Sequence, residues 1–127
     1  MPSLGMGGVH YELTSEEIDR MVTRTSAGNY ALGNISSNGL LNVKYVGRAD
    51  SDLNDRLKDH VGESVNYTHF KFLYATSSKA AFEKECHNYH DFGGNQKLNN
   101  RIHPDRPSNS KQWECPVCDA FDEKKAS

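Results

Sequence analysis

An arginine and a histidine stand one helical turn apart in the segment LNDRLKDH, residues 53–60. Arg56 and His60 are spaced i, i+4, so they are neighbours on one face of a helix. The planar guanidinium of an arginine suits a phosphate, which makes Arg56 a candidate for phosphate chemistry. The alternative is a solvated helix, because Asp52 or Asp59 could hold Arg56 in an exposed ion pair worth roughly 0.2–0.5 kcal/mol.

Two tyrosines precede this segment on expected strands. Side chains alternate across a strand, so Tyr30 shares a face with Leu32. Tyr45 shares a face with Gly47 for the same reason. If the strands pair with their tyrosines on the same side, that face carries two phenols beside a glycine. A glycine permits close approach by a backbone or a ligand, so Gly47 and the adjacent Arg48 are candidate substrate-binding residues. The alternative is a pair of core tyrosines, because tyrosine is common in strands.

A carboxylate stands beside the apolar stripe of a later helix. On a helical wheel of ~100° per residue, Cys86 and Tyr89 fall within about 40° of Phe82. Glu85 falls about 60° to one side of that stripe. A buried carboxylate costs free energy unless it is paired or binds a metal. Glu85 is therefore a candidate metal ligand, or else a residue at the rim whose head group reaches water.

The C-terminal tail carries Cys115 and Cys118 in the sequence CPVC, which has the spacing of half a zinc site. Cys86 and His90 are spaced i, i+4 on the preceding long helix and could supply the other half. A closed site with four such ligands is structural and not catalytic. The other candidates for the fourth ligand are His87 and His103. The alternative is a mobile tail with two free thiols.

Length, charge and hydropathy exclude several classes of protein. The chain has 127 residues and a formal net charge of −2, and this length predicts one domain. No apolar run approaches the ~18 residues of a membrane span, and the N-terminus lacks a secretory pattern. We therefore expect a cytoplasmic protein without membrane association. The odd number of cysteines favours reduced thiols or a metal site over a disulfide framework. The negative net charge argues against a high affinity for nucleic-acid phosphates.

Capping and periodicity predict the elements that must position these residues. Thr14 and Glu17 have the pattern of a capping box at a helix start, and Asn38-Gly39 marks a turn between two strands. We expect an α/β fold with a small three-stranded, mainly antiparallel sheet flanked by helices. The expected elements are a helix from residue 15, strands at 29–33 and 41–47, a helix at 53–61, a strand at 68–75 and a helix at 79–92.

Taken in order, these residues resemble the GIY-YIG nuclease superfamily over roughly residues 26–103. GNY at 28–30 resembles its first motif and YVG at 45–47 its second. The other matching positions are the helical arginine at Arg56, the histidine of many members at His60, the metal-binding glutamate at Glu85, and the late asparagine at Asn99 or Asn100, with Asn99 in the predicted site. Asn29 departs from the usual apolar middle residue of the first motif. It points to the other face of the strand, so the departure concerns packing more than chemistry.

The resemblance implies a metal-dependent endonuclease that hydrolyses DNA phosphodiester bonds. Glu85 would bind one divalent ion, Mg²⁺ or Mn²⁺, which polarises the phosphate and stabilises the leaving oxygen. Arg56 would neutralise charge on the phosphoryl oxygens. Tyr30 or Tyr45 would position or deprotonate the attacking water. His60 would relay the proton or contact a phosphate.

The implied organisation is an N-terminal arm and helix at 1–25, a GIY-YIG-like nuclease domain at 26–104, and a CxxC-containing tail at 105–127 that packs on the same domain. The charge balance predicts weak affinity for DNA, directed by DNA structure, by a protein partner or by a homo-oligomer. Two other classes stay open. One is a non-catalytic, zinc-stapled nucleic-acid-binding or adaptor module on a nuclease fold. The other is a redox or metal-sensing protein that works through CPVC.

Overall fold

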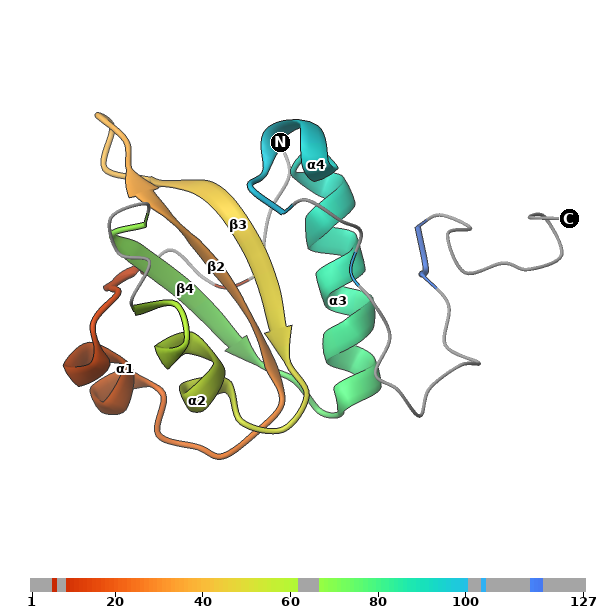
Figure 1. Cartoon of the computed structure of the whole chain (residues 1–127), viewed down its shortest axis with the longest axis horizontal. Coiled ribbons are helices and arrows are strands. Elements are labelled where there is room, and N and C mark those ends of the chain that lie inside the picture. The colour runs from red at the N-terminus through yellow and green to blue at the C-terminus, as the bar shows by residue number, and fades with distance from the viewer. Residues whose placement is uncertain (1–5, 7–8, 62–66, 101–103, 105–114, 118–127) are drawn as a thin grey trace, which may run out of the picture.

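The computed structural model describes residues 6, 9–61, 67–100, 104 and 115–117. Over these residues the chain forms a four-stranded antiparallel sheet in the order β1-β4-β2-β3, with helices on both faces (Figure 1). The elements are β1 (Tyr11–Glu12), α1 (Ser15–Met21), β2 (Gly28–Ile35), β3 (Leu41–Ala49), α2 (Leu53–Lys58), β4 (His69–Tyr74), α3 (Ser78–Asp91) and α4 (Gly94–Lys97). Among the helices described here, none is both long enough and apolar enough to cross a membrane.

β2 and β3 form the hairpin that carries both tyrosines. Gly39 in its turn has a φ of 81°, a left-handed conformation that costs a glycine little. The register places Tyr30 opposite Gly47 and Leu32 opposite Tyr45. Residues that pair directly across two strands share a face of the sheet. The two tyrosines therefore lie on the same side, which is the pairing that the alternation of side chains left open.

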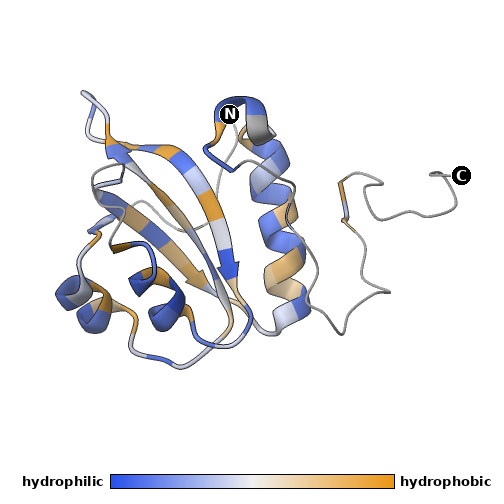
Figure 2. Cartoon of the chain, in the orientation of Figure 1, coloured by the Kyte–Doolittle hydropathy of each residue, from blue (hydrophilic) through white to orange (hydrophobic). Residues whose placement is uncertain are grey.

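α1 and α2 pack on this tyrosine face of the sheet. Thr14 caps α1 by accepting a hydrogen bond from the N–H of Glu17, as the capping pattern predicts. Asp52 caps α2 in the same way by accepting from the N–H of Asp55. The apolar side chains buried between the helices and the sheet include Ile18, Val22, Leu32, Leu53, Leu57 and Phe70. In Figure 2 the two helices are largely hydrophilic outside this core.

α3 packs on the opposite face of the sheet. Ala31 and Val46 from the hairpin cluster there with Tyr89 of α3. Asn29, the polar residue in the middle of the first motif, is 1% exposed. Its Nδ2 donates a 2.9 Å hydrogen bond to the carbonyl of Ala81 in α3. The buried amide is therefore partnered and ties β2 to α3.

Two short elements differ from the sequence-based expectation. β1 adds a fourth strand where we expected a loose arm, because Tyr11 pairs with β4 and packs its ring against Phe70 and Phe72. A strand of two residues is too short to show an alternating pattern. Gly93 and Gly94 have φ values of 97° and 59° and end α3 as glycines commonly do. The chain then forms the single turn of α4 instead of a loop.

Candidate active site

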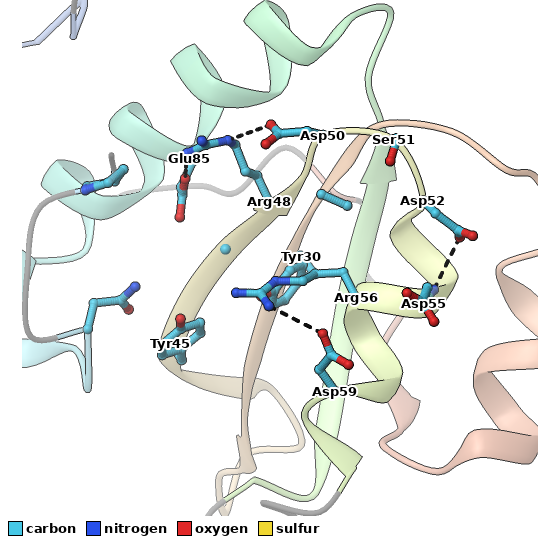
Figure 3. A pocket seen from close by; sticks show the side chains of 14 residues that line it. Tyr30, Tyr45, Arg48, Asp50, Ser51, Asp52, Asp55, Arg56, Asp59 and Glu85 are labelled. Carbon is cyan, nitrogen blue, oxygen red and sulfur yellow. Dashed lines mark hydrogen bonds and ion pairs between the residues drawn. The ribbon is translucent and has the colours of Figure 1, made fainter. Parts of the chain in front are cut away.

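A pocket of about 580 Å³ opens beside β3, the outer strand of the sheet. Figure 3 shows side chains from the hairpin, α2 and α3 converging on it. Two tyrosines, two arginines and five carboxylates are among its lining residues. Because neighbouring residues of β3 point to opposite faces of the sheet, the pocket draws on both faces around this strand. The residues central to its chemistry are Tyr30, Tyr45, Arg48, Arg56, Glu85 and Asn100.

One wall of the pocket is the tyrosine face of the hairpin. Tyr30 is fully buried and Tyr45 is half-buried, and their rings stack with 6.4 Å between centroids. A Cβ added at Gly47 would overlap the phenol ring of Tyr30. Gly47 lines the pocket. The absence of a side chain at this position makes room for the ring of Tyr30 in the same hairpin. The sequence did not indicate this packing role, and substrate binding by Gly47 stays a prediction.

His60 reaches this wall from the core, where it is 6% exposed. Its Nε2 shares a 2.7 Å hydrogen bond with Oη of Tyr30, and its ring lies 5.2 Å from the ring centroids of both Tyr30 and Tyr45. Burial raises the pKa of Tyr30 well above that of a free phenol. Tyr30 is therefore a neutral phenol at neutral pH, and in the tautomer of His60 that carries its proton on Nδ1 the hydroxyl donates to Nε2.

Arg56 projects from α2 toward the pocket, in front of Tyr30 in Figure 3. Its Nη1 lies 3.3 Å from Oδ2 of Asp59, and the two side chains are 48% and 60% exposed. An exposed pair of this kind contributes about 0–1 kcal/mol, so Arg56 can exchange Asp59 for a phosphate at little cost. The helical neighbours Arg56 and His60 thus differ in environment. Arg56 faces the open pocket, whereas His60 is buried against Tyr30.

The opposite wall of the pocket is an ion-pair cluster centred on Arg48. Its Nη1 lies 2.6 Å from Oε1 of Glu85, and its Nε lies 2.8 Å from Oδ1 of Asp50. The side chains of Arg48 and Glu85 are each only 11% exposed. The guanidinium also lies over the ring of Phe82, 5.2 Å from its centroid, in a cation–π contact. A single cation therefore bridges carboxylates from the end of β3 and from α3.

Burial and ion pairing act in opposite directions on the pKa values of this cluster. Burial raises the pKa of Glu85, and the facing Arg48 opposes that rise. For Arg48, burial acts to lower the pKa, but the contacts with Asp50 and Glu85 outweigh it and raise the pKa above the ordinary value. Arg48 is therefore charged throughout the physiological range. It supplies the partner that a carboxylate beside an apolar stripe requires.

Two adjacent asparagines bind the outer edge of β3. The side chain of Asn100 accepts a 3.0 Å hydrogen bond from the N–H of Val46 and donates a 2.7 Å bond to the carbonyl of Val46. The N–H of Asn99 donates to the carbonyl of Lys44, and its side chain donates to the hydroxyl of Tyr67. Asn100 lines the pocket, whereas the side chain of Asn99 is directed to Tyr67. Of the two asparagines that the resemblance left open, Asn100 is the one that reaches the site.

The carboxylates of Glu85 and Asp50 suit a hard divalent cation held by few protein ligands. Both contact the same guanidinium, so a common cation could reach both. Mg²⁺ commonly uses one or two carboxylates and completes its coordination with water and substrate phosphate. In the described part of the chain, no group of three or more His, Cys, Asp or Glu side chains is placed to hold a metal ion. Glu85 and Asp50 therefore fit Mg²⁺ or Mn²⁺ shared with a substrate phosphate.

The predicted zinc ligands lie next to this site but are only partly described. Cys86 of α3 and Cys115 of the tail are both buried and form a small cluster with Phe82. Burial raises the pKa of the Cys86 thiol, so a metal would have to displace its proton. His90 lies one turn further along α3. Cys118 falls outside the described residues, and zinc binding by this set stays a prediction.

Six of the eight predicted catalytic and substrate-binding residues line this pocket. They come from β2, β3, α2 and α3, and they are Tyr30, Tyr45, Gly47, Arg48, Arg56 and Glu85. Asp50 was not predicted, although a signal for it exists. It stands two residues after Arg48, on the side of an extended chain where an opposite charge can pair with that arginine. The contact between Arg48 and Glu85 has no such local signal, because 37 residues separate them.

No family model matches the chain, and comparisons with curated proteins and with solved structures also returned no match. The interpretation of the pocket therefore depends on its own residues and on the order of the sequence motifs.

Proposed function

We propose that the chain is a metal-dependent endonuclease of the GIY-YIG type that hydrolyses DNA phosphodiester bonds. The observation that carries this proposal is one pocket that gathers two phenols, an exposed arginine and a buried glutamate. These are Tyr30, Tyr45, Arg56 and Glu85, the residues that the motif order singles out. Together they can bind a phosphate, orient a water molecule and hold a divalent cation.

The charge of the pocket supports a metal-dependent reaction. Its lining includes five carboxylates and two arginines, and one of these arginines is already paired with Glu85. A phosphodiester that enters such a pocket is repelled unless a bound cation offsets the carboxylates. The net charge of −2 acts in the same direction. We therefore expect weak binding of DNA by the chain alone, with the target set by DNA structure, a protein partner or a second copy.

Arg56 and Tyr45 would act on the substrate directly. Arg56 would exchange its exposed contact with Asp59 for a phosphoryl oxygen and neutralise the charge that develops there. Tyr45, half-buried at the pocket wall, would orient the attacking water through its hydroxyl. Glu85 would hold Mg²⁺ or Mn²⁺, which supplies further charge stabilisation at the phosphate and the leaving oxygen.

The proton of the attacking water would leave through Tyr30. Because Tyr30 is a neutral phenol, Oη can accept that proton only while it passes its own proton to a neighbour. Nε2 of His60 lies 2.7 Å from Oη and can receive it. The proton would end on His60, and no free phenolate is needed. This path uses a hydrogen bond that is already formed before the substrate binds.

A non-catalytic, zinc-stapled nucleic-acid-binding or adaptor module is the second candidate. The packing of Cys115 against Cys86 and Phe82 favours it, because Cys115 then lies against the same helix that carries Glu85. In this case the tail would stabilise a binding surface. The module would bind its partner without cleaving DNA, whatever metal is added.

Cleavage assays separate the two candidates. Supercoiled plasmid, single-stranded DNA and a branched DNA would be incubated with the protein in Mg²⁺, in Mn²⁺ and in EDTA. We expect metal-dependent cleavage that Glu85→Gln lowers by at least about a hundredfold. Glu83→Gln, the same chemical change two residues earlier on α3, should retain activity. Folded protein that binds Mn²⁺ but cleaves none of these substrates would contradict the nuclease proposal and favour the adaptor module.

A further inference from the structure

The guanidinium of Arg48 stands where a counter-cation for the carboxylate cluster is needed. It contacts Oε1 of Glu85 at 2.6 Å and Oδ1 of Asp50 at 2.8 Å. A divalent cation held by Glu85 would lie close to this guanidinium. Like charges at such separations repel strongly when they are partly buried. The cation and Arg48 therefore compete for Glu85.

The two carboxylate partners of Arg48 differ in exposure, so the side chain can leave one partner and keep the other. Its partner Glu85 is 11% exposed, whereas Asp50 is 44% exposed. The contact with Asp50 uses Nε, close to the backbone, and the contact with Glu85 uses Nη1 at the tip. The tip can therefore leave Glu85 for the open pocket while Nε remains near Asp50. A phosphate in the pocket would offer that tip a new anionic partner.

We propose that Arg48 is an internal placeholder for the divalent cation, which neutralises Glu85 until the metal takes its place and which then turns to the phosphate. This inference rests on the proposed function for the identity of the cation and the phosphate. Arg48 is on this account a positioning residue, because it acts on metal binding through Glu85. The account also joins the substrate-binding role predicted for Arg48 with its observed contact to Glu85.

The placeholder makes metal binding and phosphate binding cooperative. Metal binding alone must break the contact between Arg48 and Glu85 without a replacement for the arginine. A bound phosphate supplies that replacement, so each ligand should increase the affinity for the other by the same factor. The free protein should accordingly bind Mn²⁺ weakly.

The test is Mn²⁺ binding to the full chain in the absence of DNA, measured from the electron paramagnetic resonance signal of free Mn²⁺. Arg48→Gln should lower the Kd for Mn²⁺ about tenfold, because it removes the competing charge at Glu85. Arg56→Gln is the matched control, since it removes the same charge from the same pocket without touching Glu85. Its effect should be much smaller. Adding Glu85→Gln to Arg48→Gln should abolish the gain.

Several results would overturn the placeholder. They are an unchanged or raised Kd in Arg48→Gln, an equal gain in Arg56→Gln, or a gain that persists without Glu85. Arg48→Lys provides a second test if Arg48→Gln does not fold. A lysine keeps the charge but cannot bridge two carboxylates with a planar fork. The Kd for Mn²⁺ should therefore fall by less than tenfold, and an unchanged Kd would reject the proposal.

Cleavage is measured separately, so a protein that cleaves DNA without this Arg48 effect rejects the placeholder alone. A protein that shows the effect without cleavage rejects the nuclease alone.

Discussion

Arg48 meets Glu85 at 2.6 Å on one side of the pocket, and Arg56 meets Asp59 at 3.3 Å on the other. The chemistry of the two pairs is the same, but their surroundings are not. The first pair is 11% exposed at both partners and joins β3 to α3 across the fold. The second is 48% and 60% exposed and lies within one turn of the chain.

The difference in exposure indicates that the buried pair stabilises the fold, whereas the exposed pair can bind a ligand. A buried pair cannot lose one partner cheaply, because the remaining charge has no water to replace it. An exposed pair can, because water and ions substitute for either partner. Arg56 is therefore available for a phosphate at once, whereas Arg48 becomes available only when another cation satisfies Glu85. Stability measurements on matched variants can test this contrast.

The largest effect is expected at the buried pair. Arg48→Met leaves Glu85 without its counter-charge and should lower the free energy of unfolding by about 3 kcal/mol, measured by urea denaturation at pH 7. Adding Glu85→Leu should restore most of that loss, because a well-packed apolar pair can replace a buried ion pair. If Arg48→Met alone lowers the free energy of unfolding by less than about 1 kcal/mol, the buried pair contributes no more to stability than an exposed pair.

The loss in Arg48→Met should also depend on pH in a defined direction. Burial already raises the pKa of Glu85, and removing Arg48 should raise it further. The folded state then binds more protons than the unfolded state, so stability falls as the pH rises. The cost should be smallest below the pKa of an unfolded glutamate, about 4.3, and should grow above it. A cost that is independent of pH would point to lost packing against Phe82 instead.

A smaller effect on stability is expected at the exposed pair. Arg56→Gln should change the free energy of unfolding by about 0–1 kcal/mol, measured in the same urea titration. Under the proposed function, its cleavage rate should nevertheless fall about a hundredfold or more, because the charge at the phosphate is lost. A variant that is strongly destabilised would show that Arg56 also supports the fold.

The smallest effect is expected at Asp19, which is not among the pocket-lining residues. Oδ1 of Asp19 contacts Nζ of Lys58 at 2.6 Å, and the aspartate is 60% exposed. The hydrogen bond from Lys58 lowers the pKa of Asp19 below the ordinary value of an aspartate, about 3.9. Its stabilisation is therefore present above that pH and is lost as the pH falls through the folded-state pKa. Asp19→Asn should flatten the acid limb of the stability curve and leave the neutral limb almost unchanged, the opposite pH dependence to Arg48→Met.

The parts of the fold that could be predicted are those whose signals are local. Thr14 and Asp52 cap helices through residues three positions away, and the Asn38-Gly39 turn lies within its own hairpin. Alternation along each strand placed Tyr30 with Leu32 and Tyr45 with Gly47, but it left open whether the two tyrosines share a face. The period of a single helix placed Glu85 beside the apolar stripe, and the structure buries it there instead of placing it at the rim.

The parts that could not be predicted depend on contacts between distant segments. Nothing near Glu85 in the sequence indicates that Arg48 will neutralise it. The choice between Asn99 and Asn100 depends on how the chain returns to β3 after α4. The two residues are adjacent and of the same type, and only the direction of their side chains separates them. The packing of Gly47 against Tyr30 required the register of the hairpin. Each of these contacts changes the interpretation of a site residue without changing the fold class.

The pairing of Asn100 with Val46 has a consequence for how the molecule meets other proteins. An outer strand normally exposes backbone groups that can recruit a strand from another chain, which is a route to aggregation. The side-chain amide of Asn100 and the N–H of Asn99 use these groups at Val46 and Lys44. Another polypeptide could extend the sheet along this part of β3 only by displacing both asparagines. The same short segment that brings Asn100 to the pocket therefore also blocks edge-to-edge pairing along this part of β3, beside the candidate active site.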